Sequence, residues 1–266
     1  MKSIYNFLIK YKNIVMSAII AILVLSIVLV WNIFYSDNNG VDGKVTTTVN
    51  NAAFDDSDNV LSGDSTILFV CNDEVVGKAV FMFLLDFQIV SEKIVLTPLD
   101  MNVSDGKKSY SEYYSYGGAN ELVPAVEKVR NCDIDRYIIV SKDGISGITD
   151  VLGPVNLYVS EQFTYESSDK SYTVDAGYND LESAMLYTFL KINYEKKSEN
   201  EFAGILCEII NSYLNGVEAT EAQSLFGELC NSINTDITIA DYYTCSSDIE
   251  YLLTHNTKCF VFNEGE

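Results

Sequence analysis

Two aspartates that follow short apolar runs are the side chains of this sequence best placed to do chemistry. Asp73 ends the stretch "TILFVCND", and Asp100 follows "KIVLTPL". Side chains at strand ends lie at the edge of a sheet, where open α/β proteins bind ligands, and two carboxylates there can hold one divalent cation. Aspartates after strands also begin turns and accept hydrogen bonds from loop amides. This structural role is the commoner one, and both roles remain open at this point.

Cations that could hold a phosphate group are scarce in this chain. Its only two arginines are Arg130, in a predicted helix, and Arg136, just before a predicted strand. Lys78 and Lys191 could act as point charges on a phosphate, but a lysine lacks the planar fork with which arginine grips two oxygens at once. A solvated lysine at a helix end is the more common outcome.

Aromatic and apolar side chains offer surfaces for sugars and lipids. The stretch "YSEYYSY" includes Tyr114 and Tyr116, which could stack on sugar rings or pack a turn against the sheet. The apolar residues that could line a groove for a lipid chain are the run 81–85 with Leu186, Phe189 and Ile205. Core packing is the default for such residues.

The charge balance and the N-terminus restrict the partners. The chain has 38 acidic and 17 basic residues and a formal net charge of −21, which argues against a nucleic-acid partner. Residues 14–35 are uncharged and span roughly 33 Å as a helix, enough to cross a bilayer. Three lysines precede this segment without an acidic residue, which predicts a cytoplasmic tail over residues 1–13. We therefore expect a single-pass plasma-membrane protein with an extracytoplasmic C-terminal part; a cleaved signal peptide is the alternative.

The part after the membrane segment divides into a linker and one domain. Residues 36–65 are rich in Asp, Asn, Ser, Thr and Gly, which is typical of a flexible stalk. In residues 66–266, apolar runs alternate with helical patterns such as 119–129, 143–152, 181–192, 199–214 and 221–233. Asp143 is expected to cap the second of these helices, and short mixed elements are expected near the C-terminus. This alternation predicts a layered α/β domain.

The six cysteines all follow residue 35, and an even number in an exported domain permits disulfides. Candidates for pairing are the last four, Cys207, Cys230, Cys245 and Cys259. No two cysteines are spaced as C-x-x-C, and the single His255 cannot complete a metal cluster.

Several motifs in this order resemble the LytR–CpsA–Psr (LCP) family of envelope proteins. The longest match is "YSYGGANELVPAVEKVRNCDIDRYIIVSKDGISGITDVLGPVNLYV", with a Tyr-x-Tyr-Gly-Gly segment, an Ile-Asp-x-Tyr strand and a Leu-Gly turn. The stretches "DAGYNDLESAMLYTFLK" and "FNEGE" resemble later family motifs. The resemblance implies a three-layer α-β-α domain with a central mixed sheet, preceded by one transmembrane helix.

The resemblance also implies an activity and a site. Enzymes of the family use Mg²⁺ or Mn²⁺ to move a glycopolymer from a polyprenyl-pyrophosphate carrier to peptidoglycan or a related acceptor. By motif position, Asp73 and Asp100 would bind the metal, Asp100 and Lys191 would serve catalysis, and Tyr114, Tyr116, Leu99 and Phe189 would face the substrate.

The family's arginines are missing from those motifs. Leu99 stands where one arginine is expected, Phe189 and Lys191 replace an Arg-x-Arg pair, and Gly204 and Cys207 replace two more. A metal-binding acid falls near Ala79. The losses affect phosphate-binding positions and spare the positions that build the fold. We therefore expect a catalytically silent member that binds polyprenyl-linked glycan or scaffolds envelope proteins, with an active transferase as the alternative.

Overall fold

The computed structural model describes residues 63–167 and 170–262. The expected tail at 1–13, the expected membrane segment at 14–35 and nearly all of the expected stalk at 36–65 lie outside the described residues. Within the described ranges, every helix is too short or too polar to span a membrane.

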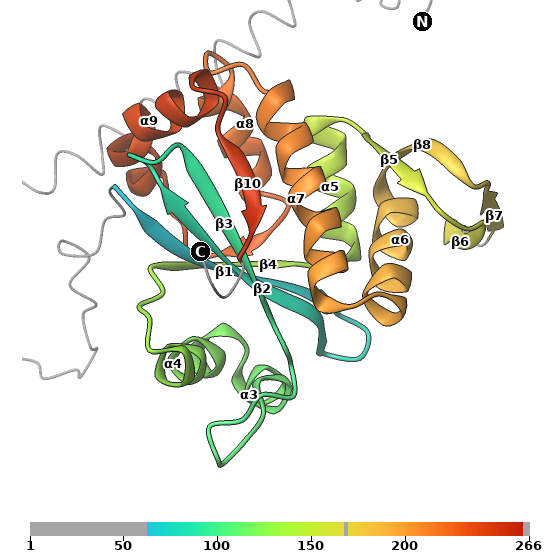
Figure 1. Cartoon of the computed structure of the whole chain (residues 1–266), viewed down its shortest axis with the longest axis horizontal. Coiled ribbons are helices and arrows are strands. Elements are labelled where there is room, and N and C mark those ends of the chain that lie inside the picture. The colour runs from blue at the N-terminus through green and yellow to red at the C-terminus, as the bar shows by residue number, and fades with distance from the viewer. Residues whose placement is uncertain (1–62, 168–169, 263–266) are drawn as a thin grey trace, which may run out of the picture. The chain divides into compact units, whose positions relative to one another are not determined.

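A six-stranded mixed sheet forms the centre of the domain. Its strands are β1 (Ser65–Asp73), β2 (Lys78–Gln88), β3 (Lys93–Leu99), β4 (Arg136–Val140), β9 (Asn234–Thr235) and β10 (Lys258–Val261). They lie in the order β10-β3-β2-β1-β4-β9 (Figure 1). β2 runs antiparallel to both β1 and β3, so β1 and β3 point the same way, as does β4 beside β1. The carboxyl ends of these three strands therefore lie at one edge.

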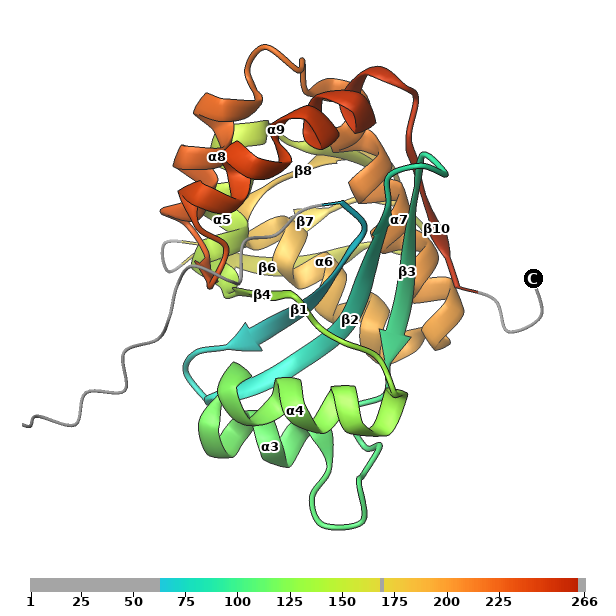
Figure 2. The ribbon, with the colours of Figure 1, turned by 90° about the vertical axis from the view of Figure 1, so that its left-hand side faces the viewer.

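Helices cover both faces of this sheet. They are α3 (Tyr110–Gly117), α4 (Ala119–Arg130), α5 (Lys142–Leu152), α6 (Ser183–Lys196), α7 (Glu199–Gly216), α8 (Ala222–Cys230) and α9 (Ile239–Thr254). Figures 1 and 2 show α3 and α4 on one face and α5, α6 and α7 on the other. This arrangement confirms the expected layered α/β domain with a central mixed sheet.

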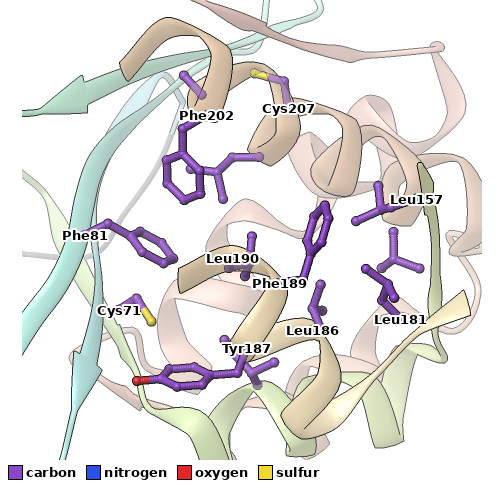
Figure 3. Packing of buried hydrophobic residues seen from close by; sticks show 14 of the residues in the cluster. Cys71, Phe81, Leu157, Leu181, Leu186, Tyr187, Phe189, Leu190, Phe202 and Cys207 are labelled. Atoms are coloured by element: carbon purple, nitrogen blue, oxygen red, sulfur yellow. The ribbon is translucent and has the colours of Figure 1, made fainter. Parts of the chain in front are cut away.

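Alternation along the strands separates two hydrophobic cores. Phe81 and Phe83 of β2 pack under α5–α7, whereas Met82 and Leu84 pack under α3 and α4, because successive side chains of a strand point to opposite faces. Figure 3 shows the first core, in which α6 lies over β1 and β2. The run 81–85 is therefore buried on both sides, which explains why it is apolar throughout.

A twisted β-ribbon projects beyond α6. Its strands are β5 (Val155–Val159), β6 (Phe163–Ser167), β7 (Lys170–Val174) and β8 (Gly177–Leu181), with β5 paired to β8 and β6 to β7. Leu157 and Phe163 pack toward the first core, and Tyr158 lies on the solvent side opposite Tyr178 of β8.

The tyrosine stretch, for which the sequence predicted no secondary structure, forms helix α3, which starts at a capping box in which Ser109 and Glu112 exchange hydrogen bonds. Two expectations about local structure were wrong. Helix α5 is capped by Ser141, whose hydroxyl accepts the Gly144 N–H at 3.1 Å, and not by Asp143. The C-terminal part contains the 16-residue helix α9, where short mixed elements were expected.

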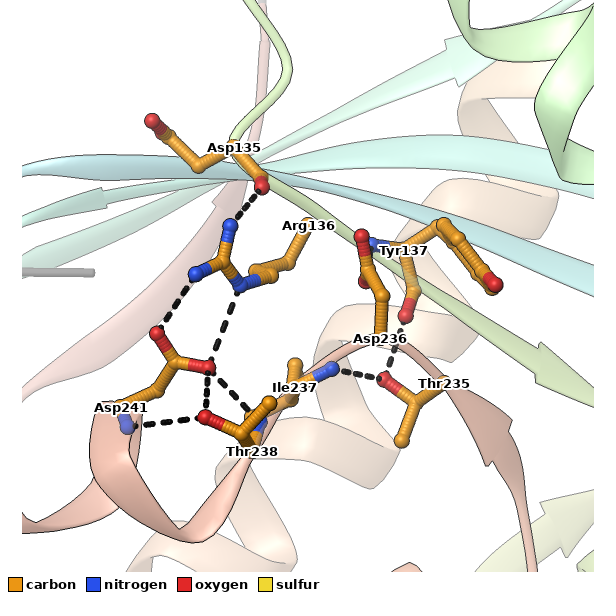
Figure 4. A network of polar contacts seen from close by, with 8 residues as sticks. All are labelled: Asp135, Arg136, Tyr137, Thr235, Asp236, Ile237, Thr238 and Asp241. Atoms are coloured by element: carbon orange, nitrogen blue, oxygen red, sulfur yellow. Dashed lines mark hydrogen bonds and ion pairs between the residues drawn. The ribbon is translucent and has the colours of Figure 1, made fainter. Parts of the chain in front are cut away.

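A buried ion pair ties α9 to the amino end of β4. The Arg136 guanidinium donates to both oxygens of Asp241, at 2.7 and 3.2 Å, and to the Asp135 carbonyl at 2.8 Å (Figure 4). Asp241 also accepts the hydroxyl and N–H of Thr238 at the helix start. Side-chain exposure is 10% for Arg136 and 2% for Asp241, so one of the two arginines is committed to the architecture.

Candidate functional site

The candidate site lies at the sheet edge where β1, β3 and β4 end. Asp73 closes β1, Asp100 directly follows β3, and Lys142 begins α5 just after β4. The strand directions bring these three positions to the same edge, as the sequence predicted for the two aspartates. Helix α6 adds Lys191, which the motif comparison had placed at this site.

Asp73 is held by a turn and by one lysine. Its Oδ1 accepts the N–H groups of Val75 and Val76 at 3.1 and 3.3 Å, and its carbonyl accepts that of Gly77. The Lys191 Nζ lies 3.9 Å from Oδ2, with side-chain exposures of 44% for Lys191 and 26% for Asp73. At this distance and exposure the ion pair is weak, so Lys191 keeps much of its charge available to a ligand.

Asp100 also closes a turn. Its Oδ1 accepts the backbone N–H and the side-chain amide of Asn102, at 2.9 and 3.0 Å. It also lies near the Tyr194 hydroxyl, whose pKa is raised first by burial and then by the negative charge of Asp100. Both aspartates therefore make the turn contacts expected of the structural role.

The acidic side chains at this edge do not fit a divalent-cation site. In the part of the chain that the structure describes, no three Asp, Glu, His or Cys side chains gather closely enough to hold a metal ion. Ala79, at the position near which the family has an acid, is buried opposite Asn72. Mg²⁺ and Mn²⁺ favour several oxygen ligands, and the turns already engage one oxygen of each aspartate.

Two lysines and two tyrosines share a cavity of about 420 Å³ between the ribbon and α6. Its walls include Lys142, Tyr165, Tyr187 and Lys191, and also the acidic residues Glu166 and Glu195. Lys142 makes a long contact of 3.5 Å from Nζ to the Glu166 carbonyl. The cavity thus combines two lysines and two glutamates with aromatic surface, beside Asp73. Lys142 and Tyr165 were not predicted from the sequence; the position of Lys142 immediately after a strand was the available signal.

The thiol and phenol behind this cavity are held in their neutral forms. Burial raises the pKa of the Cys71 thiol to about 12, helped by the charge of Asp73. Burial likewise raises the pKa of Tyr187 to about 12. A thiol must ionise to act as a nucleophile, so Cys71 serves packing, next to Phe81 and Tyr187 in Figure 3.

The four predicted substrate-facing residues do not come together. Leu99 and Tyr114 are buried in the core under α3 and α4, at 4% and 8% exposure. Phe189 is buried in the other core, where its ring lies 6.1 Å from that of Phe163. Tyr116 is 72% exposed, with the Lys108 ammonium 3.7 Å from its ring centroid. The sheet therefore separates Leu99 from Phe189.

A second cavity, which we call the dry cavity because its walls are apolar, lies between the sheet and α5–α7. It has a volume of about 170 Å³ and is lined by Phe69, Phe81, Phe83, Leu85, Ile145, Ile148, Leu186, Leu190, Leu206, Ile209, Ile210 and Tyr213. Four of the residues proposed for a lipid groove are among them, namely Phe81, Phe83, Leu85 and Leu186. Phe189 and Ile205 are not.

Comparison with known proteins places this architecture. The model of the LytR_cpsA_psr family matches residues 94–260, more than half of the chain. No curated protein matches the sequence.

Solved structures share the fold at low sequence identity. A protein from Eubacterium siraeum DSM 15702 is similar with a TM-score of 0.64 and 18% identity, over 85% of this chain and 93% of its own. TagV of B. subtilis gives 0.60 and 15%, over 77% and 86%. TagT bound to LI-WTA gives 0.53 and 12%, over 71% and 75%.

Proposed function

The chain belongs to the LytR_cpsA_psr family, and from this premise we propose that it binds a polyprenyl-linked glycan without transferring it. TagT, which shares the fold, has been solved bound to LI-WTA. In this proposal, residues 14–35 anchor the chain in the plasma membrane and the domain works on the extracytoplasmic side. The lipid tail enters the dry cavity, and the phosphates lie toward Lys191.

The dry cavity is the observation that carries the proposal. All but one of its lining side chains are hydrocarbon, and the exception is Tyr213, whose hydroxyl donates to the Gly153 carbonyl. An isoprenoid tail gains free energy from such walls in proportion to the apolar area removed from water. A polyprenyl chain is longer than this cavity, so binding requires α6 or α7 to move outward from the sheet.

The few cationic side chains at the carboxyl ends of β1 and β4 favour binding of a phosphate over catalysis. Lys142 and Lys191 can act as point charges on a phosphate. Neither arginine reaches this edge, because Arg136 is paired with Asp241 and Arg130 lies at the end of α4 on the other face. A departing pyrophosphate needs charge stabilisation that increases in the transition state, and two lysines supply little of it.

Two other roles compete with this proposal. An active transferase would use Lys142, Lys191 and a recruited metal ion in place of the family's arginines. A scaffold would use the domain surface and need no lipid. The weak Asp73–Lys191 pair favours the transferase over the scaffold, because it leaves a lysine available at the edge.

The test uses the full chain in nanodiscs with a glycan-bearing polyprenyl pyrophosphate and Mg²⁺ or Mn²⁺. We expect saturable binding and no release of polyprenyl phosphate or pyrophosphate. Leu190→Phe should fill the dry cavity and weaken binding about tenfold or more. Leu84→Phe is the matched control, because Leu84 is equally buried but lies in the opposite core.

Each outcome separates the candidates. Metal-dependent product release that Lys191→Ala abolishes would establish the transferase and reject silent binding. No binding by the folded parent chain would reject both lipid-dependent roles and leave the scaffold. Equal weakening by Leu190→Phe and Leu84→Phe would show that the dry cavity is not the lipid site.

A further inference from the structure

Two buried thiols from distant parts of the chain lie in contact between helix α7 and strand β10. Cys207 of α7 and Cys259 of β10 are 52 residues apart, and their sulfurs lie 3.2 Å from each other. Their exposures are 6% and 4%. A disulfide joins sulfurs at about 2.05 Å, so the two atoms need to approach by only about 1 Å. None of the six cysteines, all within the described residues, forms a disulfide in this structure.

The backbone independently holds these two positions together. Asn211, one helical turn after Cys207, donates its side-chain amide to the Cys259 carbonyl at 3.1 Å. The Cys259 N–H donates back to the Asn211 Oδ1 at 2.7 Å. On its other side, β10 pairs in parallel with β3, and Cys259 lies opposite Ile94. The closeness of the sulfurs therefore follows from hydrogen bonds that do not involve the thiols.

We propose that Cys207 and Cys259 form a disulfide that fastens α7 to the edge strand β10 when the chain meets an oxidising disulfide compound. The extracytoplasmic location proposed above would provide that environment. The cross-link does not depend on lipid or glycan binding. It gives the C-terminal strand, which is only four residues long, a covalent hold on the domain.

The reaction is a two-step thiol–disulfide exchange with a disulfide of a small molecule or an oxidoreductase. The thiolate of one of the two cysteines attacks one sulfur of that compound, whose S–S bond breaks and releases one thiolate. The second cysteine then loses its proton and attacks the sulfur of the first, which releases the second thiolate. Two protein thiols are oxidised by two electrons, and the external disulfide is reduced to two thiols that take up the two protons.

The folded structure protects both thiols. Cys259 donates to the Cys207 sulfur at 3.2 Å, and this bond lowers the pKa of Cys207, whereas the same bond and burial raise the pKa of Cys259. Both side chains are buried, so an external disulfide reaches them during folding or when β10 separates from the edge of the sheet. The hydrogen bond is then broken, and either thiolate can attack first.

The cross-link also affects the proposed lipid cavity. Leu206, Ile209 and Ile210 of α7 form one wall of that cavity, and Cys207 lies among them along the helix. A disulfide at Cys207 limits the outward movement of α7, so a lipid would have to enter by displacing α6.

The test is a thiol count on the purified full chain in detergent, with and without glutathione disulfide. In denaturant, titratable thiols should fall from six to four, and peptide mapping should recover a fragment that joins Cys207 to Cys259. Reducing the oxidised chain should lower its melting temperature by roughly 5–10 °C. Cys132→Ser is the control, because its half-buried thiol has no role here and this variant should still lose two thiols.

Several results would overturn the proposal. These are six thiols remaining after oxidation, a mapped link between other cysteines, or a melting temperature that does not respond to reductant. Cys207→Ser and Cys259→Ser should each prevent the loss of thiols, and mapping of the parent chain decides the matter even if one variant folds poorly. Absence of lipid binding would leave this result unchanged.

Discussion

The ion pair at the amino ends of strands β1 and β4 is buried and strong, whereas the ion pair at their carboxyl ends is partly exposed and weak. At the amino ends, Arg136 and Asp241 form a buried two-point ion pair with its remaining hydrogen bonds satisfied. At the carboxyl ends, Asp73 and Lys191 lie 3.9 Å apart and partly in solvent. A buried amide oxygen of Asn72 at this second end has no hydrogen-bond partner among the described residues.

The comparison of these two ion pairs shows that the strong one lies at the amino ends of the strands. The family resemblance implies arginines at the carboxyl ends, whereas this chain has its buried arginine at the amino ends, where it pairs with Asp241 of α9. A fully paired charge stabilises one arrangement of the chain, whereas a weakly paired lysine can exchange its partner for a ligand. The amino end is therefore expected to govern stability and the carboxyl end to govern binding.

Breaking the buried pair should give the largest effect. Asp241→Ala leaves Arg136 charged and buried, and we expect the free energy of unfolding to fall by about 3–5 kcal/mol. Urea denaturation of the full chain in detergent measures it. Glu161→Ala removes the exposed partner of Lys196 and should leave the free energy of unfolding unchanged within error. Similar costs for the two variants would remove the contrast between the ends.

Restoring an arginine at the carboxyl end should also destabilise the fold. Leu99→Arg places a charge in the core under α3 and α4, and we expect a loss of about 2–4 kcal/mol. Gly204→Arg restores another family position where a Cβ meets open space, and this variant should be neutral or slightly stabilising. A tolerated Leu99→Arg with restored transfer activity would show that packing does not exclude the arginine.

Removing the Tyr114 hydroxyl should have a smaller effect on the free energy of unfolding. Tyr114 is buried, and the side chain of Asn72 lowers the pKa of its hydroxyl against the larger raising effect of burial. Tyr114→Phe removes this polar interaction and should cost about 1 kcal/mol of unfolding free energy. The matched control is Tyr116→Phe, whose exposed hydroxyl should contribute nothing measurable to urea denaturation. A neutral Tyr114→Phe would show that Asn72 finds water instead.

The weak ion pair should contribute least to stability and most to binding. We expect Lys191→Ala to change the unfolding free energy by less than about 0.5 kcal/mol while weakening polyprenyl-pyrophosphate binding severalfold. Lys196→Ala on the same helix is the control, because its ammonium pairs with Glu161 away from this edge. A large stability loss in Lys191→Ala would mean that both ends serve the architecture.

The pH dependence of the amino end provides a finer test. Burial raises the pKa of Asp236, although its carboxylate accepts the Tyr137 N–H at 2.7 Å. With the folded pKa above the unfolded one, this group's stabilising contribution is present at low pH and is lost as pH rises through the folded pKa. Relative to the parent, Asp236→Asn should therefore gain stability between pH 3 and pH 7. An unchanged difference in urea denaturation would contradict this.

Local patterns along the chain identified most of the fold. Continuous apolar runs predicted the strands β1–β4, and helical spacing predicted α4, α5, α6, α7 and α8, because burial imposes a period that depends only on nearby residues. Helices α3 and α9 were missed, since the first is short and rich in tyrosine and the second mixes polar and apolar side chains around its surface.

Part of the site was also predictable. The placement of Asp73 and Asp100 at one edge followed from their positions after strands that run in the same direction. Lys191 came from its motif position. Lys142 and Tyr165 were missed because their approach depends on how the ribbon folds back over α6.

The sequence by itself determined the family and the apolar strands, and it predicted that arginines are missing from phosphate-binding positions. The tertiary structure alone decided that Leu99 and Phe189 lie in separate cores, that Arg136 pairs with Asp241, and that Cys207 meets Cys259. The physical reason is the distance along the chain over which each effect acts. Propensity and periodicity act over a few residues, whereas these contacts join segments whose distance depends on strand order and helix packing.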